Sequence, residues 1–222
     1  RELVSNACDA LSKRKTICGC GADSAFRIDI TVNAADKVIT VSDNGIGMTA
    51  EEVKKYISQI AYSGAEEFLE KYDGSTKNSN GIIGHFGLGF YSAFMVSDVV
   101  EIDTLSCQDD ANPVLWSCNG GPEYSIKTGS RTEPGTTIIL HIAEDSLAFI
   151  DINKIRELLI KYCSFMPYPI YINSEKEKGS QAVNNVNPLW NKQPKDCTDE
   201  EYKTFYRDTF HDYNEPLFWI HL

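Results

Sequence analysis

The feature that most constrains the fold is a short strand that runs directly into a carboxylate and two glycines. Residues 41–48 read Val-Ser-Asp-Asn-Gly-Ile-Gly-Met, after an alternating stretch that starts at Val38. The glycines carry no Cβ, so the backbone can turn tightly there and approach a flat ligand closely. A carboxylate at the end of a buried strand, as expected for Asp43, is costly unless it meets a fixed donor such as the exocyclic amine of a purine. These residues alone fit a solvated turn equally well, with Asp43 or Thr49 as a local cap.

The composition limits the classes of function. The chain has 222 residues, of which 42% are hydrophobic and 24% charged, as is usual for a soluble globular protein. Its net charge of −11 argues against a surface that binds nucleic acid by neutralising phosphates. A nucleotide can still bind in a local pocket, because helix N-termini and glycine-rich loops supply a positive field. No apolar run approaches the ~20 residues of a membrane span.

The seven cysteines favour reduced thiols in a cytoplasmic protein over a disulfide scaffold, because their spacings are irregular and the chain is long. Cys18 and Cys20 have no second pair and no nearby histidine that would complete a metal site. Both ends of the chain are expected to be cuts through structure. Arg1 lies inside a stretch of helical spacing and residues 218–222 are an apolar run, so we expect part of a longer protein, in which no targeting segment can be judged.

Periodicity predicts an α+β fold. Residues 1–15 have the spacing of an amphipathic helix, residues 26–32 and 38–41 alternate as a hairpin, and Thr49 opens a further helix. Later strands are expected at 99–104, 114–117, 124–127, 136–141 and 169–172, with a helix at 151–162 before the last of them. This order predicts a two-layer α/β sandwich in which helices cover one face of a mostly antiparallel sheet.

A domain boundary is expected late in the chain. Residues 174–187 are short, charged and polar, which predicts a linker. It would separate a domain of residues 1–173 from residues 188–222, where aromatic and acidic side chains resume at Pro188-Leu189-Trp190.

Glu2 and Asn6 form the first candidate constellation. They lie four residues apart and therefore on one face of the first helix, which Asp9 and Ala10 continue one turn later. An amide oxygen beside a carboxylate suits a hydrated Mg²⁺ that is shared with phosphates. A carboxylate one turn away can orient and deprotonate an attacking water. A solvated helix face is the ordinary interpretation of such a pair.

A second candidate is the glycine-rich stretch 81–89, which leads into an apolar helix predicted to about residue 96. Exposed backbone N–H groups and the helix N-terminus would form an anion cradle, with a flexible hinge as the alternative. The stretch lacks the Lys-Ser/Thr of a P-loop and follows no strand of a βαβ unit, which excludes the first phosphate-binding mode and disfavours a dinucleotide fingerprint. Phosphate contact with a moving lid fits better. Gly135-Thr136 adds a small polar handle at the start of a late strand.

Four segments, in this order, carry a family resemblance: residues 1–10, 43–48, 84–92 and 135–136. Together they resemble the N-terminal ATPase domain of the 90-kDa heat-shock chaperones, which belongs to the superfamily of gyrase, sensor histidine kinases and mismatch-repair ATPases. The resemblance covers nearly the whole chain, and residues 188–190 and 200–205 look like the start of that family's middle domain. It implies a Bergerat-type fold in which the helices over the sheet form the nucleotide pocket.

The resemblance implies a role for each matching residue. Asp43 would bind the adenine amine, with Gly47 and Thr136 helping through backbone, side chain and ordered water. Asn6 would hold the Mg²⁺ that bridges the phosphates of ATP or ADP, and Glu2 would be the general base. The further nucleotide-binding residues implied are Asp9, Ala10, Met48, Gly84, His85, Phe86, Gly87, Leu88, Gly89 and Phe90. Met48 and Phe90 would line the pocket, residues 87–90 would meet the phosphates, and residues 63–84 would be the lid.

Two positions depart from the family's pattern. Tyr62 stands where a Lys is frequent at the start of the lid, and Tyr56 stands where Asn or His is common, so contacts from these positions are not carried over. The short linker favours a bacterial, cytoplasmic member of the family, with an organellar one second. The family's first strand would lie before Arg1 and the arginine that reaches the γ-phosphate beyond Leu222, so we expect this chain to bind ATP or ADP and to hydrolyse ATP very slowly.

The implied function is an ATP-driven chaperone that clamps as a homodimer around unfolded or partly folded client proteins, with no nucleic-acid or membrane partner. This chain by itself is expected to be monomeric. The ATP-binding module of a sensor histidine kinase is the alternative from another class, and a nucleotide-binding or client-docking module without turnover is a third.

Overall fold

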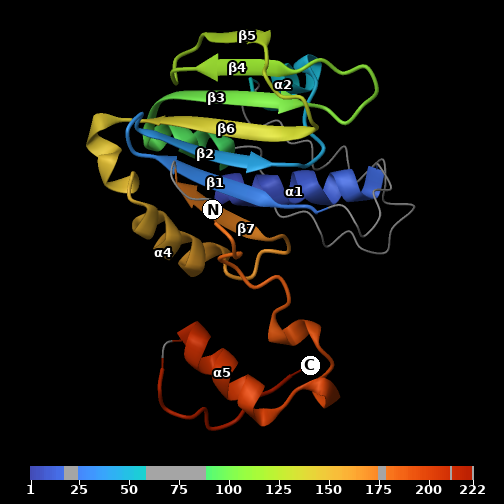
Figure 1. Ribbon diagram of the computed structural model, residues 1–222, viewed down its shortest axis with the longest axis vertical. Helices are drawn as coiled ribbons and strands as arrows, with labels where there is room; N and C mark the ends of the chain where they lie inside the picture. The colour runs from blue at the N-terminus through green and yellow to red at the C-terminus, as the bar shows by residue number, and fades with distance from the viewer. Residues whose placement is uncertain (18–24, 59–88, 175–178, 211, 222) are drawn as a thin grey trace.

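The computed structural model describes residues 1–17, 25–58, 89–174, 179–210 and 212–221 (Figure 1). Its centre is a seven-stranded sheet in the order β5-β4-β3-β6-β2-β1-β7. Neighbouring strands are antiparallel except β1 and β7, which run parallel. The strands are β1 (Ile28–Asn33), β2 (Val38–Asp43), β3 (Ser97–Leu105), β4 (Val114–Cys118), β5 (Tyr124–Thr128), β6 (Gly135–Ile142) and β7 (Ile170–Ser174).

The described helices are α1 (Glu2–Ile17), α2 (Ala50–Tyr56), α4 (Ile152–Cys163) and α5 (Asp199–Phe210). Four short 3₁₀ helices accompany them: η2 (Gly89–Met95), η3 (Glu144–Phe149), η4 (Leu189–Asn191) and η5 (Pro194–Asp196). The predicted α+β class with a mostly antiparallel sheet is confirmed. No helix among the described residues combines the length and the apolar character that crossing a membrane requires.

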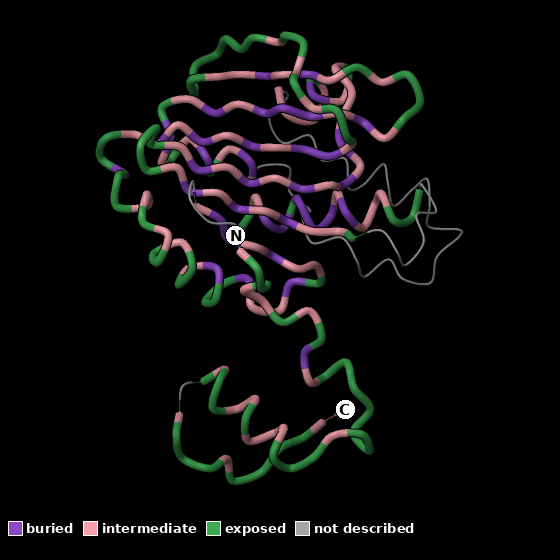
Figure 2. Tube along the Cα trace, in the orientation of Figure 1, coloured by how far each residue is buried: buried purple, intermediate pink, exposed green. Residues whose placement is uncertain are grey.

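Alternation along the strands decides which face of the sheet is buried. In β1 the side chains of Ile28, Ile30 and Val32 are buried, while those of Asp29 and Thr31 are less buried and lie on the other face. Figure 2 shows the same alternation along the central strands. Helix α1 contacts β1, β2 and η2, and η2 contacts β3, so these elements cover the apolar face. The buried side of α1 consists of Val4, Ser5, Ala7, Cys8, Asp9 and Leu11.

The start of α2 is a capping box, which confirms the helix start predicted at Thr49. The Thr49 hydroxyl accepts a hydrogen bond from the Glu52 amide at 3.3 Å, and the Glu52 carboxylate accepts one from the Thr49 amide at 2.8 Å. Thr49 therefore caps this helix and ends the glycine turn.

The apolar helix expected from about residue 89 to 96 is wrong in type, because residues 89–95 form the 3₁₀ helix η2. The Ser92 hydroxyl donates to the Gly89 carbonyl at 2.6 Å, and such a bond competes with the α-helical backbone pattern. Phe90 packs edge-on against Phe94 and against Trp116 of β4, with ring centroids 6.1 and 5.8 Å apart. This aromatic cluster holds η2 on the sheet.

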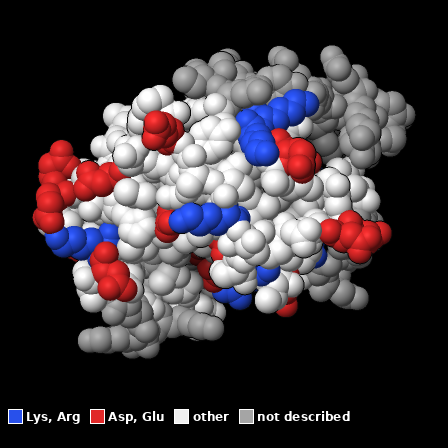
Figure 3. Space-filling model, turned by 90° about the horizontal axis from the view of Figure 1, so that it is seen from above, with Lys and Arg blue, Asp and Glu red and all other residues white. Residues whose placement is uncertain are grey.

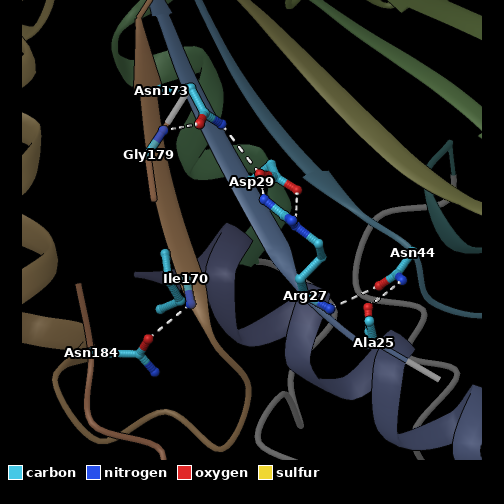
Figure 4. A network of polar contacts seen from close by, with 8 residues as sticks. All are labelled: Ala25, Arg27, Asp29, Asn44, Ile170, Asn173, Gly179 and Asn184. Carbon is cyan, nitrogen blue, oxygen red and sulfur yellow. Dashed lines mark hydrogen bonds and ion pairs between the residues drawn. The ribbon is translucent and has the colours of Figure 1, made fainter. Parts of the chain in front are cut away.

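Part of the segment that was expected to be a linker is hydrogen-bonded to β7. The Asn173 side chain accepts from the Gly179 amide at 2.8 Å and donates to Asp29 at 3.2 Å (Figure 4). Asn184 accepts from the Ile170 amide at 2.8 Å and donates to the carbonyls of Met166 and Tyr168, both at 2.9 Å. The described residues from 179 to 184 thus return to the outer edge of the sheet, and a linker over 174–187 stays a prediction.

The C-terminal segment, drawn in orange and red in Figure 1, meets the rest of the chain at an aromatic contact. Phe165, which follows α4, lies 4.7 Å from Trp190 and 5.9 Å from Phe205 of α5, measured between ring centroids. A cleft of about 1330 Å³ separates α4 from α5. On the face of the molecule shown in Figure 3, acidic and basic side chains are interspersed with uncharged ones.

Candidate functional site

Three polar side chains form a row on the helix-covered face of the sheet. The register pairs Asp43 of β2 with Thr136 of β6, and Thr136 with Thr104 of β3. All three residues are buried, with exposed fractions of 7%, 7% and 0%. The hydroxyls of Thr104 and Thr136 lie 3.0 Å apart. Polar groups on a buried apolar face cost free energy without partners, and each side chain of this row has one, since Asp43 accepts from the Gly45 amide and the two threonine hydroxyls contact each other.

The environment of Asp43 disfavours its charge. Burial raises the pKa of this carboxyl from 3.8 to about 6, although the Gly45 amide, the Arg131 charge and the Thr136 amide each act to lower it. Oδ1 of Asp43 accepts the Gly45 N–H at 2.7 Å. Asp43 therefore does stabilise the local turn, one of the two interpretations open from sequence. When it is ionised, the buried Asp43 carboxylate is also a strong acceptor for one further donor, such as an amine.

The loop after β2 packs between α1 and the end of β3. The Ile46 amide donates to the Ala10 carbonyl at 3.1 Å, and the Cys107 amide donates to the Ile46 carbonyl at 2.8 Å. Gly47 has φ of +63°, and a Cβ there would lie 1.8 Å from the Leu105 carbonyl oxygen. Only glycine fits this backbone conformation and this space. The loop is thus fixed in place next to Ala10, one of the residues predicted for the site.

Thr104 is a site residue that sequence reasoning missed. Its hydroxyl accepts the Met48 amide at 3.0 Å and donates to the Gly135 carbonyl at 3.1 Å or to Thr136. It joins the glycine loop to the start of β6, and so links two of the predicted segments. Only the register of β3 against β6 reveals this, because Thr104 is 56 residues from Met48 and belongs to no local motif.

Helix α1 carries four further predicted residues. Glu2 and Asn6 are exposed on it, Asp9 is buried and Ala10 is partly buried. A Cβ at Gly89 would lie 2.7 Å from Glu2 Oε2, so the structure places the Glu2 carboxylate at the start of η2. Ala10 contacts the glycine loop as described above.

Of the remaining predicted residues, the structure describes two. Met48 is partly buried against the core, and Phe90 is buried in the aromatic cluster, so the structure gives both a packing role. Their pocket-lining role stays a prediction. Gly84, His85, Phe86, Gly87 and Leu88 lie outside the described residues, as does the proposed lid at 63–84.

The donor set on α1 fits a magnesium ion that is shared with phosphates. Within the described part of the chain, no three His, Cys, Asp or Glu side chains come together to hold a metal ion. The exposed Asn6 amide is an oxygen donor of the kind Mg²⁺ accepts, and Mg²⁺ commonly takes its other ligands from water and phosphate. Asn6 is therefore suited to a metal that arrives with a nucleotide and not to a resident protein-only site.

Of the predicted site residues that the structure describes, none lines the large cleft between α4 and α5. Among the described cysteines, Cys8, Cys118, Cys163 and Cys197 are free thiols. Burial raises the pKa of the Cys8 thiol to about 12, so this thiol is neutral and unreactive. The candidate chemistry therefore concentrates on α1, the glycine loop and the β2–β6–β3 row.

The chain is similar to known proteins along its whole length. The family model described as histidine kinase-, DNA gyrase B- and HSP90-like ATPase matches residues 1–119, and the model described as Hsp90 protein matches residues 176–222. The chain is 46% identical over 235 residues to Chaperone protein HtpG of Porphyromonas gingivalis, and 47% identical over 233 residues to that of Bacteroides thetaiotaomicron. It is 37% identical over 242 residues to Chaperone protein HtpG of Idiomarina loihiensis.

These alignments cover 100% of the chain, but the chain spans only 34%, 34% and 38% of these relatives, respectively. The resemblance stated from the sequence is confirmed, since the first family model covers more than half of the chain. The chain belongs to the family of histidine kinase-, DNA gyrase B- and HSP90-like ATPases.

Proposed function

We propose that this chain is the ATP-binding and ATP-hydrolysing part of a molecular chaperone. The observation that carries the proposal is the buried Asp43 carboxylate, in register with Thr136 on the face of the sheet that the helices cover. The match to the Hsp90 model and the relatives named Chaperone protein HtpG support the chaperone assignment.

In this proposal Asp43 recognises the base. The ionised carboxylate accepts the exocyclic amine of adenine, and the Thr136 hydroxyl beside it offers a second polar contact. The loop that contains Gly47 and Met48 lies against β3, so the base would meet a fixed surface and not a mobile loop. A fixed acceptor is favourable because little order has to be created on binding.

The phosphates would lie along α1 toward Glu2. Asn6 would hold the Mg²⁺, which neutralises phosphate charge when it is bound. Glu2, one turn before Asn6, would orient the attacking water and take its proton. The proximity of Glu2 to Gly89 supports this direction, because Gly89 ends the glycine-rich stretch proposed to meet the phosphates. Asp9, Ala10 and residues 84–90 complete the proposed nucleotide contacts.

For the whole protein we propose nucleotide-driven closure of the lid and clamping of a homodimer on unfolded or partly folded clients. A bacterial cytoplasmic location is proposed with it, since the relatives above are bacterial. We propose no nucleic-acid or membrane partner. Residues 174–187 and 188–222 are proposed as the linker and the start of the middle domain, with support from the Hsp90 match over 176–222.

The histidine kinase alternative predicts a different use of the same pocket. A kinase would transfer phosphate to a histidine and would not need Glu2 to activate water. The Hsp90 match favours the chaperone.

The test is calorimetry with ADP, with and without Mg²⁺, on the wild type and on Asp43→Asn. We expect the wild type to bind and Asp43→Asn to lose binding, because the amide presents its own donors toward the amine. Asp98→Asn, on the exposed part of β3, is the matched control and should bind like the wild type. Glu2→Ala should keep ADP binding and lose ATP hydrolysis. Retained affinity in Asp43→Asn would remove this residue from the adenine role, and hydrolysis that survives Glu2→Ala would remove the general base.

A further inference from the structure

Arg131 lies in the loop before β6, and its side chain binds the end of β2 and the start of β6. It does so on the open face of the sheet, which is the face opposite to α1. Its Nη1 donates to the Thr137 hydroxyl at 2.6 Å and to the Ser42 hydroxyl at 3.3 Å. Its Nη2 donates to the Asp43 carbonyl at 3.1 Å. The Ser42 and Thr137 hydroxyls lie 2.9 Å from each other. One guanidinium group therefore joins the two strands directly behind Asp43 and Thr136.

Arg14 of α1 holds the same turn from the helix-covered side. Its Nη1 donates to the Asn44 carbonyl at 2.6 Å and to the Pro134 carbonyl at 3.4 Å. The Asn44 side chain adds two bonds to the residues just before β1, donating to the Ala25 carbonyl and accepting from the Arg27 amide, both at 2.9 Å (Figure 4). The consecutive carbonyls of Asp43 and Asn44 are thus each fixed by a different arginine.

Gly135 makes this arrangement possible. Its φ is +138°, and a Cβ there would lie 2.2 Å from the Asp43 carbonyl oxygen and 2.6 Å from Arg131 Nη2. A side chain at this position would separate the guanidinium group from the carbonyl that it binds. The Gly-Thr pair recognised in the sequence therefore provides the space for Arg131 as well as the Thr136 hydroxyl.

We propose that Arg131 is a positioning residue for purine recognition. By joining Ser42, Asp43 and Thr137 it fixes the Asp43 carboxylate against Thr136 in the geometry that selects a purine with an exocyclic amine. This inference rests on the proposed nucleotide-binding function. It assigns Arg131 no contact with the ligand, because its guanidinium group binds hydroxyls on the opposite face of the sheet from the carboxylate.

The charges around Asp43 support the same role. The positive charges of Arg131 and Arg14 both lower the pKa of Asp43, against the larger effect of its burial. On α1, the charges of Asp43 and of the neighbouring Asp9 both act to raise the pKa of the buried Cys8 thiol. Burial lowers the pKa of Arg131, and three negative charges act to raise it. They belong to Asp43, Asp103 and Glu133. Loss of Arg131 would therefore disfavour the ionised acceptor in addition to loosening its position.

The test compares ADP with purine riboside 5′-diphosphate, which lacks the exocyclic amine, in calorimetric titrations at pH 7.5. For Arg131→Met we expect ADP affinity to fall about tenfold, as for loss of bonds to a charged group, while affinity for the analogue changes less than about twofold. Arg131→Lys keeps the charge but not the two-pronged contact, so its loss of ADP affinity should be selective and smaller. Arg156→Met removes an exposed arginine of α4 and should match the wild type.

Equal losses for both ligands would show a purely structural role and would overturn the proposal, as would wild-type ADP affinity in both Arg131 variants. Thermal melting shows whether each variant is folded, and if Arg131→Met does not fold, Arg131→Lys carries the same comparison. Failure of the underlying function looks different. In that case the wild type itself would not bind ADP, or would not prefer ADP to the analogue.

Discussion

The Glu2 carboxylate lies against the backbone of Gly89, so closely that a Cβ on Gly89 would be 2.7 Å from Glu2 Oε2. This contact joins the first residue of α1 to the first residue of η2. It places the proposed general base beside the end of the glycine-rich stretch.

Gly89→Ala tests this relationship. The new methyl group would displace the Glu2 side chain, which is exposed and can rotate away at little cost in stability. We expect single-turnover ATP hydrolysis to slow by about tenfold or more, a part of what a general base contributes. ADP affinity should stay within about twofold, because alanine keeps the backbone N–H groups. Gly121→Ala, in the β4–β5 turn, is the control. If Gly89→Ala hydrolysed ATP at the wild-type rate, the position of Glu2 beside Gly89 would not matter for hydrolysis and Glu2 would lose its role as the general base.

The raised pKa of Asp43 predicts how stability depends on pH. The folded protein holds this proton up to about pH 6, whereas an unfolded Asp releases it near 3.8. Between these values the folded state binds more protons, so rising pH removes stability, by about 3 kcal/mol for a shift of roughly two pH units.

Asp43→Asn lacks this titration. We therefore expect the unliganded variant to be more stable than the wild type at pH 7, and the difference to shrink as the pH falls toward 4.5. Urea unfolding of both proteins across this range measures it. Asp98→Asn should show no such trend, and a wild type that is more stable than Asp43→Asn at pH 7 would contradict the prediction.

Gly47→Ala should destabilise the fold by about 3 kcal/mol or more, because the Cβ would overlap the rigid Leu105 carbonyl as well as strain the backbone. Gly120→Ala separates these two effects. Gly120 also has positive φ, at +80°, but its Cβ would only touch the Phe94 ring at 3.4 Å, so a cost of about 1 kcal/mol is expected. Chemical denaturation compares the two variants, and equal losses would mean that the steric overlap is relieved.

Thr104→Val keeps the shape of the side chain and removes its hydroxyl. The Met48 amide and the Thr136 hydroxyl would lose a buried partner, so we expect a loss of about 1–3 kcal/mol in the free energy of unfolding. ADP affinity should fall as well, because the glycine loop and β6 are no longer joined. Thr31→Val, on the open face of β1, controls for the substitution. If stability and affinity were unchanged in Thr104→Val, the Thr104 hydroxyl would contribute to neither.

Asn184→Ala tests whether the segment before residue 188 is part of the nucleotide domain. It removes three hydrogen bonds to the connection between α4 and β7 and to the first residue of β7, which predicts a loss of about 2 kcal/mol or more in domain stability. Asn187→Ala, whose exposed side chain is the matched control, should be neutral. A neutral result for Asn184 as well would favour a free linker over residues 174–187.

The parts of the fold that depend on local pattern follow from the sequence. Alternation predicted the β1–β2 hairpin, and Thr49 predicted the start of α2, since both signals lie within a few residues. The 3₁₀ geometry of η2 did not follow, because apolar spacing over seven residues does not distinguish it from an α-helix. The hydrogen bonds of Asn184 to β7 were also missed, since composition alone says nothing about side-chain partners.

The candidate site divides in the same way. Asp43 and the glycines after it stand out locally, but their sequence left a turn and a purine site as equal interpretations. Thr104 and Arg131 could not be found, because they act across the sheet on residues 56 and 88 positions away. Sheet register decides such contacts, and register is a property of the whole fold.

The position of β6 in the sheet has a consequence for how the protein is made. β6 lies between β2 and β3, and therefore between the β1–β2 hairpin and the β3–β4–β5 meander, although the ribosome synthesises both before it. A nascent chain that ends before residue 135 holds two separate partial sheets, each with an unpaired edge where β6 belongs. Such edges are prone to wrong pairing, and long-range strand pairing is slow. Insertion of β6 joins the two partial sheets and completes the Asp43–Thr136–Thr104 row in a single step, so nucleotide binding should first become available to the growing chain when this strand emerges.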